Sequence, residues 1–536
     1  MSPNSFISAI LRISFQSGDI YEFRISLHFG GISEVLRIYI PLDENFSPER
    51  LPLILLHHHL PSFQTTYLRD FLFDLSLYYL QVALASEILK VFRLIYLKMH
   101  ELGFEGGIVV FHDLLLRANV YVDDGKISEF SVTERPCERR INCKGKLVMH
   151  GVVDVHVHFR EPGLTHKENW LTGSSAAAAG GVTTVLEMPN TKPPTATKTL
   201  LEEKIKIASR KSLVDFHFHF GALHLDELLH IKVPSVKFYL AGVEGLPAPD
   251  DEFLLRAFKL LARRGIVAAV HAEDATLVEK ALKSLKKGKP KDYHLARDER
   301  CAVEAVKRVL RLTAEAKGVK IHICHVTCGG EVELLRRSQS NSELIGGTLS
   351  GEVTPTHLFL TLDAADRLGN YVKVAPPLRT RASQRALWAS LRGGVLRIVA
   401  SDHAPHTKEE KERGVLDAPP GVPGVETMLP LFLNEANKGN ISYCQIASWL
   451  HYYPVKRFGL KKEFKEGEDA DIIVVAPKEE WVIKEGELRS KCGWSPFDGW
   501  HVRGRVERTF VRGIEIYNGE IVGEPGSGRL AKLQNF

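Results

Sequence analysis

The sequence predicts an α/β fold in which a TIM-like (β/α)8 barrel, residues 150–455, carries a small β domain built from residues 105–149 and 456–525. Three observations support this prediction. Apolar strand-like runs alternate with helix-like segments through the middle of the chain, as in a parallel sheet with helical connections. Short β-like runs stand on both sides of that region. The length of 536 residues also exceeds one ordinary core and allows a barrel plus a smaller domain.

Residues 1–104 differ in character from the rest, and we expect an atypical N-terminal extension that the native protein lacks or leaves poorly ordered. Its most apolar part, 70–97, is interrupted by charges, among them Asp74, Glu87, Lys90 and Arg93. A bilayer span needs about 20 apolar residues with few charges, so we expect no membrane segment here. The basic start and cleavage site of a signal peptide are also missing. A translation start at Met99 or just beyond it would explain the change in character.

The elements then follow in order. Residues 107–147 contain short β runs around a turn signal at Asp123-Asp124-Gly125. Eight barrel strands are expected at 152–159, 183–188, 214–221, 236–240, 267–272, 320–326, 352–357 and 396–401. Short β runs return at 470–475, 505–511 and 514–517. The simplest arrangement pairs this tail with residues 107–147 in one domain that the barrel interrupts.

The bulk composition indicates a cytoplasmic globular protein without a nucleic-acid partner. The chain is 44% apolar and 25% charged, and its net charge of +5 is small and not concentrated in one basic run. The seven cysteines are odd in number and form no CxxC pair, so we expect reduced thiols. Cys324 and Cys328, which flank His325, are expected to be packing residues.

The most informative stretch is 152–163, which reads VVDVHVHFREPG. Alternate side chains of a strand share a face, so His156 and His158 project together and form half of a metal site. Arg160 shares that face and offers a forked cation to a carboxylate. Taken alone, a His-x-His pair is a weak signal because most such pairs are structural. The other ligands must therefore come from the rest of the chain.

Four further polar side chains stand at later strand ends: Lys237, His271, His325 and Asp402. Strand ends meet at one mouth of a barrel, so we expect a two-metal site there. His156, His158 and Asp402 would bind one ion, and His271 and His325 the other. A buried lysine loses its proton easily, and the neutral Lys237 amine can add carbon dioxide to become a carbamate that bridges both ions. Two ions about 3.5–4 Å apart would share a hydroxide nucleophile.

These residues resemble the amidohydrolase superfamily, in its cyclic-amidase branch, and within that branch the dihydroorotase family. The similarity covers residues 107–525 and rests on DVHVHFREPG (154–163), GGVTTVLEMPNT (180–191), HICHVT (322–327), APPLR (375–379), SDHAPHTKEEK (401–411), SPFDGW (495–500) and TFVRGIEIYNGEIV (509–522). The resemblance implies two zinc ions and the reversible interconversion of dihydroorotate and N-carbamoyl-L-aspartate in UMP biosynthesis. Asp402 would take the proton of the zinc-bound hydroxide as general base, then return it to the ring nitrogen as general acid.

Dihydroorotate is a cyclic amide with a free carboxylate, so its site needs a cation or hydrogen-bond donors beside the metals. The resemblance implies that Arg160, Asn190 and His406 bind that carboxylate. It also implies that the backbone of Pro420 and Gly421 contacts the ring. Other members of the branch that open uncharged rings typically lack the arginine, which makes Arg160 the discriminating residue. For Arg160, the alternative is an ordinary surface salt bridge.

Two alternatives stay open at this point. The chain could be an allantoinase or another cyclic amidase that resembles hydantoinases and dihydropyrimidinases, or an inactive scaffold of the same fold. Ala375 departs from the family pattern, because many relatives carry Asn before the Pro-Pro pair. As partners we expect the small-molecule substrate, and either a homo-oligomer or an association with aspartate carbamoyltransferase, but no nucleic acid and no membrane.

Overall fold

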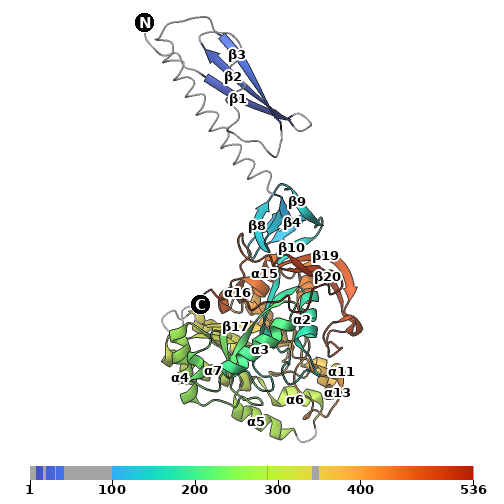
Figure 1. Cartoon of the computed structure of the whole chain (residues 1–536). Coiled ribbons are helices and arrows are strands. Elements are labelled where there is room, and N and C mark those ends of the chain that lie inside the picture. The colour runs from blue at the N-terminus through green and yellow to red at the C-terminus, as the bar shows by residue number, and fades with distance from the viewer. Residues whose placement is uncertain are drawn as a thin grey trace. The chain divides into compact units, whose positions relative to one another are not determined.

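The computed structural model describes residues 8–15, 20–29, 32–41, 99–285, 288–340 and 349–534. The chain divides into two compact units, residues 1–91 and 92–536 (Figure 1). In the first unit, β1 (Ser8–Phe15), β2 (Ile20–Phe29) and β3 (Ile32–Pro41) form an antiparallel sheet in sequence order. The apolar segment 70–97, for which we expect no membrane span, lies outside the described residues.

The second unit contains the predicted barrel. Eight parallel strands pair in sequence order: β11 (Val152–Val157), β12 (Val182–Glu187), β13 (Asp215–Gly221), β14 (Ser235–Tyr239), β15 (Val267–His271), β16 (Lys320–Ile323), β17 (Leu349–Val353) and β18 (Ile398–Val399). A bridge between Val157 and His403 joins the first strand to the segment after the last, with His158 N donating to His403 O at 2.8 Å. The prediction of a TIM-like barrel with a small β domain is confirmed.

Helices lie on the outside of the strands (Figure 1). They are α2 (Trp170–Ala179), α3 (Lys198–Lys211), α4 (Asp251–Arg264), α5 (Ala275–Ser284), α6 (Pro290–Ala296), α7 (Glu299–Ala316), α8 (Gly329–Ser340), α10 (Pro355–Phe359), α11 (Ala365–Leu368), α12 (Arg381–Arg392), α13 (Lys408–Lys411), α14 (Met428–Asn437), α15 (Tyr443–Ala447) and α16 (Tyr453–Phe458). Helix α4 shows why such segments are helical. Asp250 caps its first turn, Gly265 ends it in the left-handed conformation, and Leu254, Phe258 and Leu261 form its buried stripe.

The small β domain joins segments from both sides of the barrel. One sheet has the order β21-β20-β19-β10-β5-β6 and the other β8-β7-β4-β9. Their bounds are β4 (His100–Glu105), β5 (Ile108–Val110), β6 (Leu115–Arg117), β7 (Asn119–Asp123), β8 (Lys126–Ser131), β9 (Cys137–Asn142), β10 (Leu147–His150), β19 (Ile472–Val482), β20 (His501–Val511) and β21 (Ile514–Tyr517). Leu147 of β10 pairs with Val475 of β19, as expected for a domain that the barrel interrupts. Phe104 and Phe510 meet edge to face in its core, with ring centroids 4.8 Å apart.

Seven of the eight barrel strands end one to four residues earlier than the sequence predicted, and the last two show why. The seventh was expected at 352–357, but β17 ends at Val353 because Thr354 caps a helix and Pro355 opens it. The eighth was expected at 396–401 and pairs only over Ile398–Val399. Asp402 therefore lies in a loop just beyond β18.

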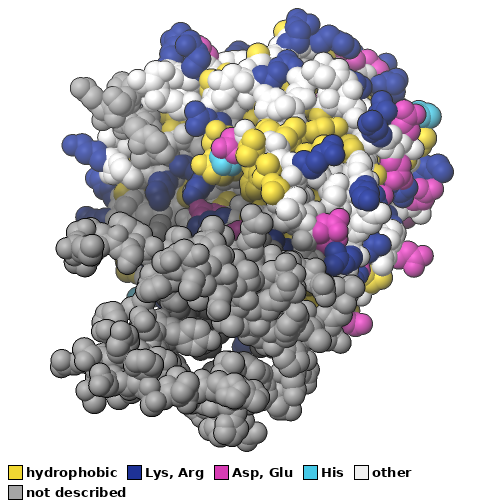
Figure 2. Space-filling model, turned by 90° about the horizontal axis from the view of Figure 1, so that it is seen from above, with side chains coloured by type: hydrophobic (Ala, Val, Ile, Leu, Met, Phe, Trp, Pro, Cys, Tyr) yellow, Lys and Arg dark blue, Asp and Glu magenta, His cyan; other side chains and the backbone are white. Residues whose placement is uncertain are grey.

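Charges of both signs are mixed on the face of the protein drawn in Figure 2. Lys and Arg side chains are scattered there among Asp and Glu side chains and do not gather into one basic patch. Among the described residues, no helix has the length and apolar character needed to cross a membrane.

Candidate metal centre and substrate pocket

The six predicted metal ligands come together at the carboxyl end of the barrel. His156 lies in β11, His158 just after it, Lys237 in β14 and His271 at the last position of β15. His325 and Asp402 stand two and three residues beyond β16 and β18. Three ring-centroid distances connect the imidazoles: 5.4 Å for His156–His158, 5.3 Å for His156–His325 and 4.5 Å for His271–His325.

Asp402 contacts the two histidines of the first strand. Its Oδ1 lies 3.4 Å from His156 Nε2 and 3.2 Å from His158 Nε2. Burial would raise the pKa of Asp402, but the neighbouring His156, His158 and Lys237 outweigh that effect and lower it to about 2. Asp402 is thus a carboxylate at neutral pH. With the two histidines it forms one of two groups of described side chains that could hold a metal ion.

Lys237 is 1% exposed, and its amine faces the interior of the site. Its Nζ donates a hydrogen bond to Cys324 Sγ at 3.0 Å and stands 5.2 Å from the centre of the Tyr239 ring. Burial is the main cause that lowers the pKa of His271 and of His325, and the charge of Lys237 contributes in both cases. The lysine is therefore directed toward the imidazoles, as its predicted role requires.

Cys324 is buried, as expected of a packing residue, but it also contacts the site. Its thiol accepts the hydrogen bond of Lys237, and with His156 and Glu352 it forms the second group of side chains that could hold a metal ion. Cys324 directly precedes His325, and the turn of the chain after β16 directs both side chains into the site. Cys328 is buried and belongs to the segment that leads into α8.

Two buried carboxylates orient the histidines, and sequence reasoning missed both. Glu352 hydrogen-bonds His156 Nδ1, and its other oxygen lies 2.9 Å from His322 Nε2. Glu273 Oε2 lies 2.8 Å from His271 Nε2, and Arg297 Nε donates to Glu273 Oε1 at 2.7 Å. Carboxylates that hold the outer nitrogen of a ligand histidine fix its tautomer and ring orientation. Two signals in the sequence could have found them: Glu273 stands two residues after His271, and Glu352 is the only charged residue of β17.

Three site residues adopt positive φ angles that are uncommon for residues other than glycine: Arg160 at 65°, His325 at 36° and Asp402 at 46°. Each follows a barrel strand closely. Left-handed residues of this kind cost free energy and persist only where the surrounding structure imposes them, often at functional sites. The residues with positive φ angles therefore lie at the same end of the barrel as the imidazole cluster.

The predicted carboxylate-binding residues lie beside this cluster. Arg160 is buried, so it does not form a surface salt bridge, and its Nε donates to Pro405 O at 3.2 Å. His406 Nε2 lies 3.1 Å from both Arg160 Nη2 and Pro420 O. At Gly421, with a φ of 141°, a Cβ atom would stand 2.4 Å from Ala404 O, so only glycine fits against this segment.

Asn190 is the remaining predicted substrate ligand, and it connects the two parts of the site. Its Oδ1 accepts a hydrogen bond from His158 Nδ1 at 2.7 Å. That bond places the proton of His158 on Nδ1 and leaves Nε2, which faces Asp402, with a free lone pair. Burial also lowers the pKa of His158 to about 3, which keeps the ring neutral, as a metal ligand must be.

The residues fit a pair of divalent ions. Neutral imidazoles and a carboxylate are the donors that zinc prefers, and an oriented outer nitrogen is typical of ligand histidines. His325 Nδ1 is buried and has no hydrogen-bond partner among the described residues, as expected of an atom that awaits a ligand.

A comparison with known protein families identifies the region of the chain that contains the barrel. The model of the Amidohydrolase family matches residues 147–522. The chain belongs to the amidohydrolase family, whose members are typically metal-dependent.

Curated relatives narrow the class to cyclic amidohydrolases. The chain is 35% identical to the dihydroorotase of Methanosarcina mazei over 81% of this chain and 98% of that protein. It is 37% identical to the dihydroorotase of Methanothermobacter thermautotrophicus, over 78% and 95%. Among solved structures, an L-hydantoinase (dihydropyrimidinase) from Arthrobacter aurescens superposes with a TM-score of 0.77 at 32% identity, over 81% of this chain and 100% of that one. A D-hydantoinase gives 0.75 at 27% identity, over 81% and 99%.

Proposed function

We propose that the protein is a dihydroorotase, which interconverts dihydroorotate and N-carbamoyl-L-aspartate on the route to UMP. The observation that carries the proposal is Arg160, a buried guanidinium beside the imidazole cluster with His406 at its side. An enzyme for an uncharged ring has no use for a buried cation there, since burying a charge without an anionic partner is costly. The curated relatives support the same reading. The alternative is a cyclic amidase for uncharged rings, which the hydantoinase structures favour.

The proposed metal site would hold two zinc ions. His156, His158 and Asp402 would hold one ion and His271 and His325 the other, and Lys237, as a carbamate, would serve both. The Asp402 contacts of 3.4 and 3.2 Å and the buried position of Lys237 support this division of ligands. When bound, such a pair generates a hydroxide at neutral pH and polarises the ring carbonyl.

In this proposal, side chains of the protein transfer the proton and bind the substrate. Asp402 is ionised and lies beside His156 and His158, so it can accept the proton of the attacking water as general base and then return it to the departing ring nitrogen. Arg160 and His406 bind the substrate carboxylate, together with the amide donor Nδ2 of Asn190, whose oxygen is occupied by His158. The backbone at Pro420 and Gly421 lies against the ring.

The first prediction separates the two substrate classes. Arg160→Ala is expected to raise KM for dihydroorotate about ten- to a hundredfold with a smaller change in kcat, since a charge-assisted hydrogen bond contributes about 1.5–3 kcal/mol. KM for the uncharged ring dihydrouracil should not rise. Steady-state assays of both substrates with the wild-type and variant enzymes measure this.

A general effect of losing an arginine must be separated from the loss of this particular contact. Arg381→Ala, at the exposed start of α12, removes an arginine outside the site and should leave both KM values unchanged. An unchanged KM for dihydroorotate in the Arg160 variant, or efficient turnover of dihydrouracil by the wild-type enzyme, would favour the alternative function.

A second prediction concerns the orientation of His271. Glu273→Gln keeps the shape of the side chain but weakens its bond to His271 Nε2, so affinity for the second metal ion should fall about 10–100-fold. Zinc content after dialysis against graded chelator measures the change. Glu279→Gln, which alters an exposed carboxylate on α5, is the matched control. Equal zinc retention in both variants would show that Glu273 does not position the ligand.

The expected environment and partners complete the proposal. All seven cysteines are free thiols, which supports a reducing compartment such as the cytoplasm. The enzyme would act alone as a homo-oligomer or associate with aspartate carbamoyltransferase, whose product is the open-chain substrate. Mass measurement of the complex purified from its native source distinguishes these two arrangements.

A further inference from the structure

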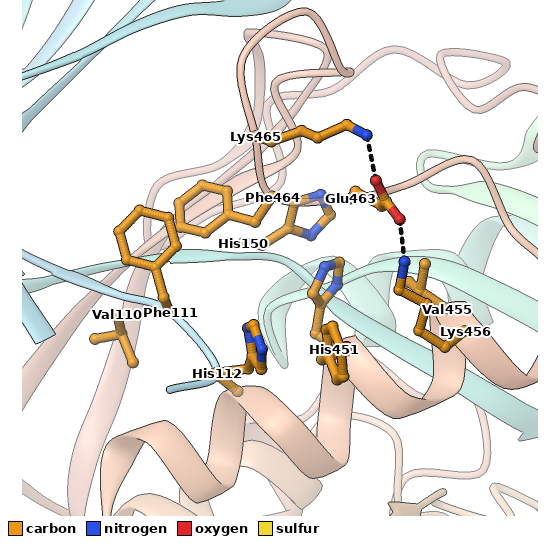
Figure 3. A pocket seen from close by; sticks show the side chains of 12 residues that line it. Val110, Phe111, His112, His150, His451, Val455, Lys456, Glu463, Phe464 and Lys465 are labelled. Carbon is orange, nitrogen blue, oxygen red and sulfur yellow. Dashed lines mark hydrogen bonds and ion pairs between the residues drawn. The ribbon is translucent and has the colours of Figure 1, made fainter. Parts of the chain in front are cut away.

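A cavity of about 220 Å³ lies away from the imidazole cluster, and Figure 3 shows the side chains that line it. His150, which lines it, ends β10 just before β11 begins. Five residues lie between His150 and His156, and six steps of nearly extended chain span about 20 Å at most. The cavity is thus a separate site, enclosed by the small β domain, the helices after α14 and the loop that follows α16.

Two histidines in this cavity each present an unpaired ring nitrogen. His150 is 4% exposed and His451 7% exposed, and their ring centroids are 3.8 Å apart. His150 Nδ1 donates to Gly151 O at 2.9 Å, and the ring of His451 also bonds the Gly151 backbone. His150 Nε2 and His451 Nδ1 are buried without a hydrogen-bond partner among the described residues.

These two nitrogens are hydrogen-bond acceptors. Burial lowers the pKa of His150 to about 3 and that of His451 well below its usual range, so both rings are neutral. The proton of each neutral ring lies on the nitrogen that bonds Gly151, which leaves a lone pair on the other nitrogen. Buried polar atoms without partners are rare in proteins, and two side by side call for a ligand that brings donors.

The walls of the cavity are flat and aromatic. His112 stacks on Tyr452 with centroids 3.9 Å apart and planes 2° from parallel, and Phe464 stands edge-on to His150 at 5.6 Å. Phe111 packs against Phe464 at 5.1 Å. His451 and Tyr452 belong to a π-helical turn, Ser448–Tyr452, a local feature found frequently at functional sites. Such walls favour a planar ligand.

The charged side chains that line the mouth of the cavity are two lysines and one glutamate. Glu463 forms ion pairs with both Lys456 and Lys465, as the dashed lines in Figure 3 show. Among these lining side chains, the two ammonium groups outnumber the one carboxylate. Both lysine side chains are about half exposed, so they can reorient toward an incoming anion.

We propose that this cavity binds a small planar heterocycle that directs ring N–H groups to His150 and His451 and an acidic substituent to Lys456 and Lys465. A metal ion suits the cavity less well. Among the described residues, no third His, Cys or carboxylate completes a ligand group there, and Glu463 is held by the lysines. The proposal does not depend on the proposed function, because the two sites share no residue.

Orotate is the probe, since it is planar and carries two ring N–H groups and a carboxylate. It could also enter the active site, so binding is measured by calorimetry with the Arg160→Ala enzyme, and crystals of that enzyme are soaked with orotate. Benzoate, which lacks the N–H groups, and uracil, which lacks the acid, are the matched probes. We expect orotate in the cavity and about tenfold weaker binding of each matched probe.

Variants test which groups recognise the probe. Lys456→Gln should weaken orotate about tenfold and leave uracil unchanged, while Lys461→Gln, an exposed lysine outside the cavity, should change neither. His451→Phe keeps the ring and should weaken both orotate and uracil. If that variant does not fold, the comparison of Lys456→Gln with Lys461→Gln still tests the proposal.

Several results would overturn the proposal. These are a cavity that holds only water after soaking, benzoate binding as tightly as orotate, and equal effects of the two lysine variants. Zinc alone bound between the two ring nitrogens in crystals soaked with zinc chloride would also overturn it.

Discussion

The Asp402→Asn enzyme is expected to lose about 10³–10⁴-fold in kcat in both directions, because the change removes the only ionised side chain that the proposal gives a proton-transfer role. Asn has nearly the same shape and can still contact His156 and His158, but it cannot accept a proton. Ring opening is followed by the loss of dihydroorotate absorbance and ring closure by its appearance from N-carbamoyl-L-aspartate.

The loss must be separated from unfolding. Asp417→Asn changes an exposed carboxylate in the loop after β18 and should keep full activity. Thermal melting of both variants should match the wild type to within a few degrees. A turnover within about tenfold of wild type in the Asp402 variant would remove this residue from the role of base and acid.

The Lys237→Ala enzyme is expected to lose both metal occupancy and turnover. A bridging ligand contributes to both ions, so the loss should exceed the about 10–100-fold that outer partners of ligands produce. Zinc should fall from two ions per subunit to one or none, as measured by elemental analysis after gel filtration. In the wild type, mass spectrometry of the intact protein should show the added mass of carbon dioxide, which acid removes.

Lys232→Ala is the matched control for this experiment, since Lys232 is an exposed lysine just before the same strand. It should keep two zinc ions and full turnover. Two zinc ions and ordinary activity in the Lys237 variant would contradict the bridging carbamate. Bicarbonate should also speed the recovery of activity when zinc is returned to the metal-free wild type, and should have no effect on the variant.

The two kinds of relatives carry the names of enzymes for different substrates, and the proposed role of Arg160 would account for the similarity of this chain to both. The relatives named dihydroorotase are 35% and 37% identical in sequence, while the hydantoinase structures share the barrel at 32% and 27% identity. The proposed metal ligands at the strand ends follow from the barrel and from the ring-opening chemistry, so they do not distinguish the two substrates. In the proposed function, the charge that would recognise the substrate is that of Arg160, which lies at the side of the site next to His406. For the choice between these substrates, the kinetics of the Arg160 variant are therefore stronger evidence than the percentage of sequence identity.

The sequence alone determined the order of the barrel strands and the positions of six polar residues at their ends. It could do so because strand periodicity and apolar runs are local signals, and because parallel strands in a barrel must direct their carboxyl ends to one mouth. His156, His158 and Arg160 share a strand face, so their common direction also followed from spacing alone. The pairing of residues 107–147 with the tail followed from two incomplete β segments that flank one barrel.

Only the tertiary structure decided which groups surround these ligands. Glu352 and His156 are far apart in the sequence, and no local pattern indicates that a carboxylate of β17 orients an imidazole of β11. The bond from Lys237 to Cys324 and the facing rings of His150 and His451 likewise join distant segments. Such contacts depend on packing between elements, which fixes side-chain directions that periodicity along one strand cannot specify.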